Sequence, residues 1–296
     1  MSLPDNFSAI IANLPRRSLL ILAQAIQHRL LTDASLVSIK EKKQYVTQAD
    51  YDIQQAILDY FQQSPLQKSY YVKAEEAFTN PVATVGTPTW QLLIDPLDGT
   101  TAFCEQQTTW GVMVGAGAVT GELLYSWNLV STGEVYSTTT AKLNQLVPQS
   151  FAAKIQREQA ITIDVYDYGA SAGDRFGAQF TAMSGIERHQ FKQTAYPAAV
   201  WAGWKLYQGA LDGLVWLPSN QGKGVYPDYD LIFLGALAAQ GWCIQLGKIK
   251  DTVAMVTIAA TPGDAALLYE VGRNLVPAEI RPKLYATRDL IITKKI

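Results

Sequence analysis

The stretch WQLLIDPLDGTTAF, residues 90–103, decides the fold of this chain. Its apolar residues 92–94 have the length and composition of a buried strand. Pro96 has no N–H group and cannot continue a central strand, so the chain is predicted to turn at Asp95 and Pro96. Asp95 and Asp98 then lie at the end of a strand, where carboxylates suit a hard cation such as Mg²⁺.

The three residues that follow, Gly99, Thr100 and Thr101, offer backbone N–H groups and two hydroxyls. Such N–H groups bind phosphate, and a cation held beside a phosphate is the arrangement of a metal-assisted phosphatase. An ordinary turn is the alternative interpretation. Asp-Pro and Asp-Gly are common turn pairs, and Asp or Thr often caps a helix.

Composition limits the classes of function that remain. The chain has 296 residues, enough for one large domain or two ordinary ones, and it is 48% hydrophobic and 17% charged, so it can bury a large core. A formal net charge of −2 gives no basic surface for a nucleic-acid polymer. No apolar run reaches the length of a membrane span. A small molecule is therefore the expected partner.

Cysteine and histidine are scarce. Cys104 and Cys243 cannot form a disulfide framework, and the N-terminus does not have the pattern of a signal peptide, so we expect a cytoplasmic protein. His28 and His189 are the only histidines, which argues against a zinc site rich in imidazole. Carboxylates and hydroxyls must then carry any chemistry.

Apolar periodicity predicts a mixture of helices and strands along the whole chain. Helices are expected at about 8–31, 53–61, 176–183, 198–211 and 229–239, and strands at 70–72, 161–165 and 214–217. A boundary near 147–160 predicts two domains, 1–150 and 151–296. The basic stretch 39–44 is either a solvated loop or a loop that approaches the metal site.

Acidic residues at three further places in the chain are candidates for the same site. Asp50 stands at the start of a predicted helix, and a helix cap is the alternative interpretation of this acid. Glu75 and Glu76 follow a predicted strand, where paired acids are usually solvated. Asp230 starts a predicted helix that is apolar nearly all round, so an acid there is either a cap stabilised by the helix dipole or part of a buried site.

Together these motifs resemble the inositol monophosphatase family. The family signature is an apolar strand followed by D-P-[LI]-D-G-T-T-x-F, which residues 92–103 match. The family's V-T-x-x-D matches Val46 to Asp50, its G-E-E matches Ala74 to Glu76 with Ala for Gly, and its W-D motif matches Tyr229-Asp230 with Tyr for Trp. The resemblance implies an α/β protein with the layered αβαβα fold, an α+β N-terminal part and an α/β C-terminal part.

The resemblance also implies a Mg²⁺-dependent phosphatase with two or three ions, inhibited by Li⁺. It places the metal on Glu76, Asp95, Asp98, Asp230 and the carbonyl of Leu97. Thr100, paired with Glu76, would orient and deprotonate the attacking water, and Asp50 would support the metal and water network. The N–H groups of Gly99 to Thr101 would hold the phosphate. The family is often dimeric, so a homodimer is expected.

Departures from the family leave the substrate open. Lys223 stands seven residues before Asp230, where inositol-specific members tend to have an acid. Those members also have Gly-[ST]-Ala-Ala at the start of the helix that lines the pocket, where this chain has Tyr196-Pro197-Ala198-Ala199. Lys223 is either a solvated lysine or a pocket cation that favours a second anionic group; Tyr196 could stack on a ring or base. The alternatives to an inositol monophosphate-like substrate are a 3′(2′),5′-bisphosphate nucleotide, or no substrate in a catalytically weak binding protein.

Overall fold

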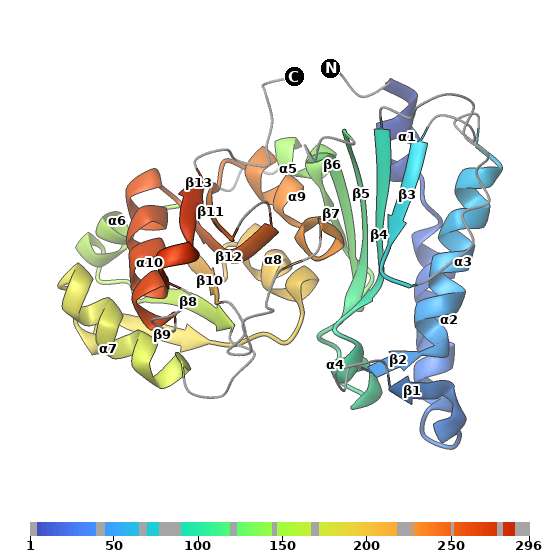
Figure 1. Ribbon diagram of the computed structural model, residues 1–296, viewed down its shortest axis with the longest axis horizontal. Helices are drawn as coiled ribbons and strands as arrows, with labels where there is room; N and C mark the ends of the chain where they lie inside the picture. The colour runs from blue at the N-terminus through green and yellow to red at the C-terminus, as the bar shows by residue number, and fades with distance from the viewer. Residues whose placement is uncertain are drawn as a thin grey trace.

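A computed structural model describes residues 5–39, 45–64, 70–76, 90–118, 123–143, 147–166, 172–217, 226, 228–249, 252–276 and 281–287. In these ranges the chain forms two large sheets and a small one (Figure 1). The basic residues 40–44 and Lys223 lie outside the described ranges. None of the described helices combines the length and hydropathy that a membrane span requires.

The first large sheet has five strands in the order β3-β4-β5-β6-β7, and only β3 and β4 run parallel. Its strand β4 carries the first nine residues of the stretch 90–103, and it is buried on both faces. The strands are Tyr70–Ala74 (β3), Trp90–Asp98 (β4), Gly111–Ala118 (β5), Leu123–Val130 (β6) and Val135–Ser137 (β7). The hairpin-like pair β1 (Val37–Ile39) and β2 (Tyr45–Thr47) forms the small sheet.

The second large sheet has six strands in the order β13-β11-β12-β10-β8-β9. Strand β8 runs parallel to β9 and to β10, and the other pairs are antiparallel. The strands are Ile161–Tyr166 (β8), Phe191–Thr194 (β9), Gly213–Trp216 (β10), Cys243–Ile249 (β11), Thr252–Ala259 (β12) and Tyr285–Thr287 (β13).

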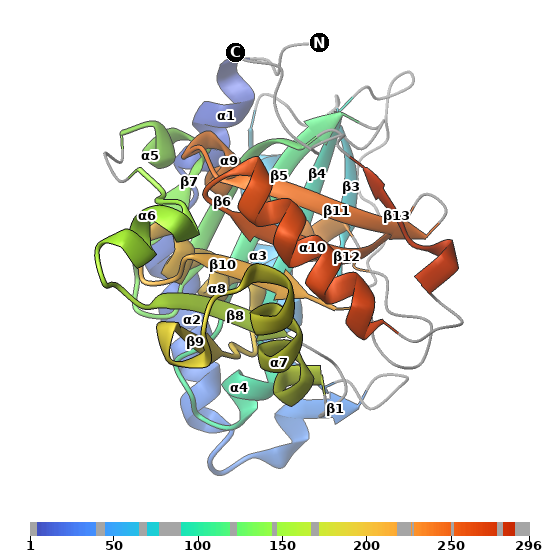
Figure 2. The same ribbon diagram turned by 90° about the vertical axis from the view of Figure 1, so that its left-hand side faces the viewer.

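Helices lie in three layers around and between the two large sheets, which confirms the predicted αβαβα arrangement (Figures 1 and 2). The outer layer on the five-stranded sheet is α1 (Asp5–Ala12), α2 (Arg16–Arg29) and α3 (Gln48–Gln62). The middle layer is α5 (Thr138–Leu143), α8 (Ala199–Tyr207) and α9 (Leu234–Ala239). The outer layer on the six-stranded sheet is α6 (Phe151–Gln156), α7 (Ala172–Ser184) and α10 (Pro262–Leu275).

Three clusters of buried apolar side chains fill the spaces between these layers. The middle cluster joins residues of both sheets, for example Met113 of β5 and Val256 of β12, so the two halves of the chain share one core. Strand β5 has glycines at positions where the middle layer of helices packs closely against it. A Cβ atom at Gly111 would lie 2.8 Å from a methyl of Val200, and one at Gly115 would lie 3.1 Å from Ile232.

Two predicted helices are wrong in their extent. The helix expected at 8–31 is two helices, because Pro15 cannot donate the N–H group that a continuous helix needs, and α2 begins just after it. The helix expected from Tyr229 begins instead at Leu234, and residues Asp228–Leu231 form a 3₁₀ turn, η4. The division at residue 150 stays a prediction, although each large sheet takes its strands from one side of it.

Candidate active site

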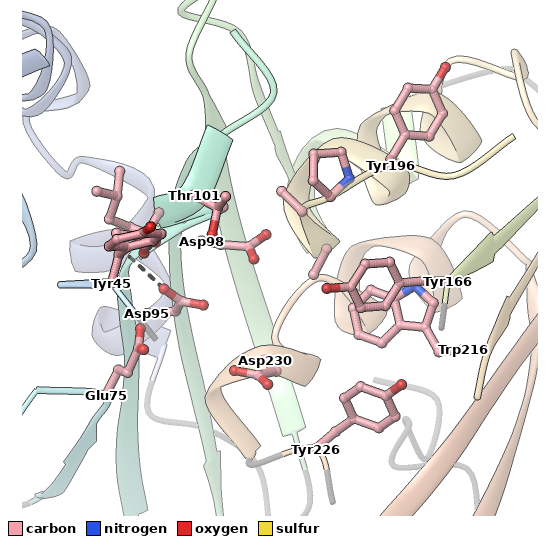
Figure 3. A pocket seen from close by; sticks show the side chains of 16 residues that line it. Tyr45, Glu75, Asp95, Asp98, Thr101, Tyr166, Tyr196, Trp216, Tyr226 and Asp230 are labelled. Carbon is pink, nitrogen blue, oxygen red and sulfur yellow. Dashed lines mark hydrogen bonds between the residues drawn. The ribbon is translucent and has the colours of Figure 1, made fainter. Parts of the chain in front are cut away.

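The acidic candidates meet in a pocket between the two large sheets (Figure 3). Glu75, Asp95, Asp98 and Asp230 point their carboxylates toward a common space, and the opposite side of that space is aromatic. The other lining residues are Tyr45, Leu97, Gly99, Thr100, Thr101, Tyr166, Tyr196, Pro197, Ala198, Ala199, Trp216 and Tyr226.

Strand β4 brings Asp95 and Asp98 into the pocket through a bulge. Asp95 pairs with Met113 and Asp98 with Gly111, and the register shifts between them. The predicted turn at Pro96 is therefore wrong: the strand continues to Asp98, and the proline occupies the bulge, where no ladder N–H is needed. The N–H of Leu97 donates to Asp95 Oδ1 at 3.2 Å, which fixes that carboxylate.

The residues just after the bulge turn the chain sharply into a short helix. Gly99 has φ +89°, and a Cβ atom there would lie 2.8 Å from Ala198 Cβ, so only glycine fits the turn without strain. Thr100 begins the short helix α4, Thr100–Cys104. Asp98 Oδ2 accepts the N–H of Val200 at 2.5 Å, which joins the bulge to the first turn of α8.

Asp230 reaches the pocket from η4, and contacts between η4 and β4 bring it beside the bulge. An ion pair supports this placement from outside: Lys73 Nζ of β3 lies 2.5 Å from Asp228 Oδ2, two residues before Asp230. Two elements that are far apart in the sequence are thereby held together next to the acidic cluster.

The structure brings Glu75, rather than the predicted Glu76, to the pocket wall. Glu76 is buried, and its main chain is fixed by the side chain of Gln54, which donates to Glu76 O and accepts from Glu76 N, both at 3.1 Å. The two acids are not far apart, since carboxylate oxygens of Asp50, Glu75 and Glu76 lie within 4.8 Å of one another. Glu75 belongs to both groups and connects them.

Asp50 and Thr100 are in contact at the edge of the carboxylate cluster. Thr47 caps α3, and Asp50 Oδ2 completes the capping box by accepting from the N–H and the hydroxyl of Thr47, both at 2.7 Å. Its Oδ1 faces Thr100 Oγ1 at 3.4 Å, and the same hydroxyl lies 3.0 Å from Leu97 O. The Thr100 hydroxyl thus faces Asp50 and the carbonyl of Leu97, and its pairing with Glu76 stays a prediction.

Burial and mutual repulsion make these carboxylates hard to ionise without a cation. Burial raises the pKa of Asp95, and the charges of Glu75, Asp98 and Asp230 raise it further. Burial raises the pKa of Asp98 to about 7, against the hydrogen bond from Val200 that lowers it. Burial raises the pKa of Asp230, with a further rise from Asp98 and Glu75.

This donor set fits Mg²⁺. The pocket offers carboxylate oxygens from three segments and a main-chain carbonyl at Leu97, which are hard ligands, and no imidazole or thiolate among the described lining residues. The mutual repulsion that raises the pKa values is what a divalent cation would offset.

The substrate-binding predictions have mixed outcomes. Gly99, Thr100 and Thr101 line the pocket, and so does Tyr196, although its ring points away from the aspartates at the rim. Lys223 lies outside the described residues.

Sequence reasoning missed three aromatic residues of the pocket, Tyr166, Trp216 and Tyr226. Each has the pattern of an ordinary core aromatic until the pairing of the strands is known.

Fold and site together define a layered α/β protein with a carboxylate-rich site for hard cations. The sequence profile of the inositol monophosphatase family matches residues 4–164, more than half of the chain. The chain belongs to the inositol monophosphatase family, which confirms the resemblance drawn from the motifs. No curated protein matches the chain significantly by sequence.

Solved structures with the same fold include an inositol monophosphatase from Anabaena, 13% identical, with a TM-score of 0.58 over 92% of this chain and 96% of that one. A staphylococcal inositol monophosphatase in a lithium inhibitory complex is 12% identical, with a TM-score of 0.58 over 86% and 91%. An IMPase/NADP phosphatase complexed with Mg²⁺ and phosphate is 11% identical, with a TM-score of 0.56 over 86% and 93%. At these identities the likeness shows the fold.

Proposed function

We propose that this protein is a Mg²⁺-dependent phosphatase that hydrolyses a small phosphomonoester, inositol monophosphate-like in size, by direct attack of water. One observation carries the proposal: Glu75, Asp95, Asp98 and Asp230 come from three distant segments and line a single pocket. Membership in the family and the neighbour solved with Mg²⁺ and phosphate support it. Glu75 takes the ligand role that the motif comparison gave to Glu76.

Glu75, Asp95, Asp98, Asp230 and the carbonyl of Leu97 would hold two or three Mg²⁺ ions. When bound, Mg²⁺ lowers the pKa of the attacking water and stabilises the charge on the phosphate and on the leaving oxygen. The N–H groups around Gly99 to Thr101 orient the phosphate. No residue of the chain needs to become phosphorylated.

Thr100 and Asp50 orient the water and remove its proton. The hydroxyl of Thr100 accepts a hydrogen from the water and passes its own hydrogen toward Asp50 Oδ1, which faces it at 3.4 Å. Burial raises the pKa of Asp50 to about 7, so this carboxylate is suited to accept a proton near neutral pH. Thr47 holds Asp50 in position through the cap of α3.

A panel of phosphomonoesters at fixed Mg²⁺ tests the proposal and separates the substrates. The panel contains p-nitrophenyl phosphate, inositol 1-phosphate and adenosine 3′,5′-bisphosphate, each with and without EDTA. We expect Mg²⁺-dependent release of phosphate from at least one. Release from the bisphosphate alone would favour the nucleotidase alternative, which one neighbour's description as an NADP phosphatase also motivates. Release from none would favour a binding protein.

Lithium should inhibit the turnover, because the carboxylates Asp95, Asp98 and Asp230 surround one side of the pocket and a neighbour of the same fold was solved as a lithium inhibitory complex. The measurement is the rate of phosphate release as LiCl is raised to high millimolar levels at fixed Mg²⁺, with NaCl as the ionic-strength control. Equal rates in the two salts would contradict this prediction.

A further inference from the structure

The side of the pocket opposite Glu75 and Asp95 is a wall of aromatic rings (Figure 3). Tyr166 is the last residue of β8 and Trp216 is the last residue of β10, and the two residues are partners in the parallel pairing of these strands. Their side chains therefore lie next to each other at the carboxyl end of the sheet, the edge at which parallel sheets bind ligands. Tyr226, bridged to Val253 of β12, lies beside Trp216.

Ring packing makes this wall rigid. The ring centroids of Tyr166 and Trp216 lie 6.0 Å apart, and those of Trp216 and Tyr226 lie 5.0 Å apart. The hydroxyl of Tyr226 donates to Leu217 O at 2.7 Å. Trp216 is 5% exposed and Tyr226 is 3% exposed, whereas Tyr166 is only partly buried. Trp216 thus packs against both tyrosine rings and holds them in place, and Tyr166 is the most accessible ring of the three.

The chemistry of this wall suits a flat ring better than a polyol. Each hydroxyl of a polyol needs a donor or an acceptor, and the described residues of this wall offer two tyrosine hydroxyls, of which that of Tyr226 is bonded to Leu217 O, and no carboxylate or side-chain amide. Pro197 and Ala198 continue the apolar surface from the start of α8. A planar aromatic ring gives up few hydrogen bonds to water when it binds to such a surface, and it gains stacking against a fixed partner.

We infer that Tyr166, supported by Trp216 and Tyr226, is a stacking subsite for an aromatic ring on the alcohol whose phosphate ester is cleaved. The substrate class is a phosphomonoester of an alcohol that carries a planar ring close to the ester oxygen, of which a nucleoside is an example. The inference rests on the proposed function, since it places the phosphate at the carboxylate cluster and the leaving alcohol on the aromatic wall.

Benzyl phosphate and cyclohexylmethyl phosphate form a matched pair for the test, because both are esters of primary alcohols of similar size and only one ring is flat. We expect kcat/KM with Mg²⁺ to be about tenfold higher for benzyl phosphate, the ratio given by a stacking free energy of about 1.4 kcal/mol. The ratio should fall to about one in Tyr166→Leu, and it should be unchanged in Tyr51→Leu, an exposed tyrosine of α3 outside the pocket. Equal kcat/KM values in the wild type would overturn the subsite.

Binding of the two corresponding phosphonates, benzylphosphonate and cyclohexylmethylphosphonate, separates this inference from the proposed function. Calorimetric titration of the wild type in Mg²⁺ needs no turnover and no variant. About tenfold tighter binding of benzylphosphonate supports the subsite even if no ester is hydrolysed, in which case it is the phosphatase proposal that fails. Equal affinity, or no binding of either phosphonate, would overturn the subsite.

Discussion

Glu75 and Glu76 are neighbours in the chain but have different surroundings. Glu75 faces the aspartates, and Glu76 is buried beside Asp50 with its main chain fixed by Gln54. We therefore expect Glu75→Gln to lower turnover by more than about 100-fold and to weaken Mg²⁺ binding, because it removes a ligand. Glu76→Gln should cost about tenfold, the lower end of what supporting residues contribute. Calorimetric Mg²⁺ titration and kcat measure both variants, and the reverse order would restore Glu76 as the ligand.

Asp164 of β8 is a buried acid outside the metal site. It accepts hydrogen bonds from Tyr196 N and Thr194 Oγ1, while its Oδ2 has no hydrogen-bond partner among the residues that the structure describes. Burial raises its pKa to about 7 from 3.8 in the unfolded chain. The folded state then binds more protons than the unfolded state between these values, so the free energy of unfolding falls as pH rises through this window.

Replacement by the neutral amide removes this pH dependence. Asp164→Asn should lose less stability than the wild type between pH 5 and pH 8, by about 2 to 3 kcal/mol. Urea unfolding at the two pH values measures the difference. Parallel losses in the two proteins would show that Asp164 is ionised in the folded state at pH 5.

At the scale of elements, the ion pair between Lys73 of β3 and Asp228 of η4 holds the segment that carries Asp230. Both side chains are more than 40% exposed, so the pair should add little to the free energy of unfolding. Its expected effect is on the position of Asp230. Lys73→Met should raise the Mg²⁺ concentration for half-maximal turnover several-fold, and the charge-reversed pair Lys73→Asp with Asp228→Lys should partly restore it.

Arg29→Met is the matched control, because it breaks an exposed ion pair at the end of α2, between Arg29 and Asp33, neither of which lines the pocket. The Mg²⁺ requirement of this variant should equal that of the wild type. If Lys73→Met behaves like Arg29→Met, or if the reversed pair is no better than Lys73→Met alone, the ion pair does not position Asp230.

Local patterns in the sequence predict the elements that depend on a few neighbouring residues. The apolar run of β4 and the acids that flank Pro96 both follow from one short stretch. The choice between Glu75 and Glu76 could not be predicted, because it depends on Gln54, which is 22 residues from Glu76. The aromatic wall depends on the pairing of β8 with β10, which no local pattern encodes.

At the scale of the whole molecule, the candidate site needs both halves of the chain. Glu75, Asp95 and Asp98 come from the first half and Asp230 comes from the second, and the hydrogen bond from Val200 to Asp98 crosses between them. The shared middle core holds the halves in this relation. The central claim is that the carboxylates collected in this way bind Mg²⁺ and thereby make the protein a phosphatase.

The most direct test of this claim compares phosphate release from p-nitrophenyl phosphate by the wild type and by Asp95→Asn. The rate is measured as free Mg²⁺ is raised from zero in EDTA. The account predicts a wild-type rate that is negligible in EDTA and saturates with Mg²⁺. It predicts a rate lower by several orders of magnitude in Asp95→Asn, because Asp95 lies at the centre of the ligand set. Full wild-type turnover in EDTA, or equal rates in the two proteins, would contradict it.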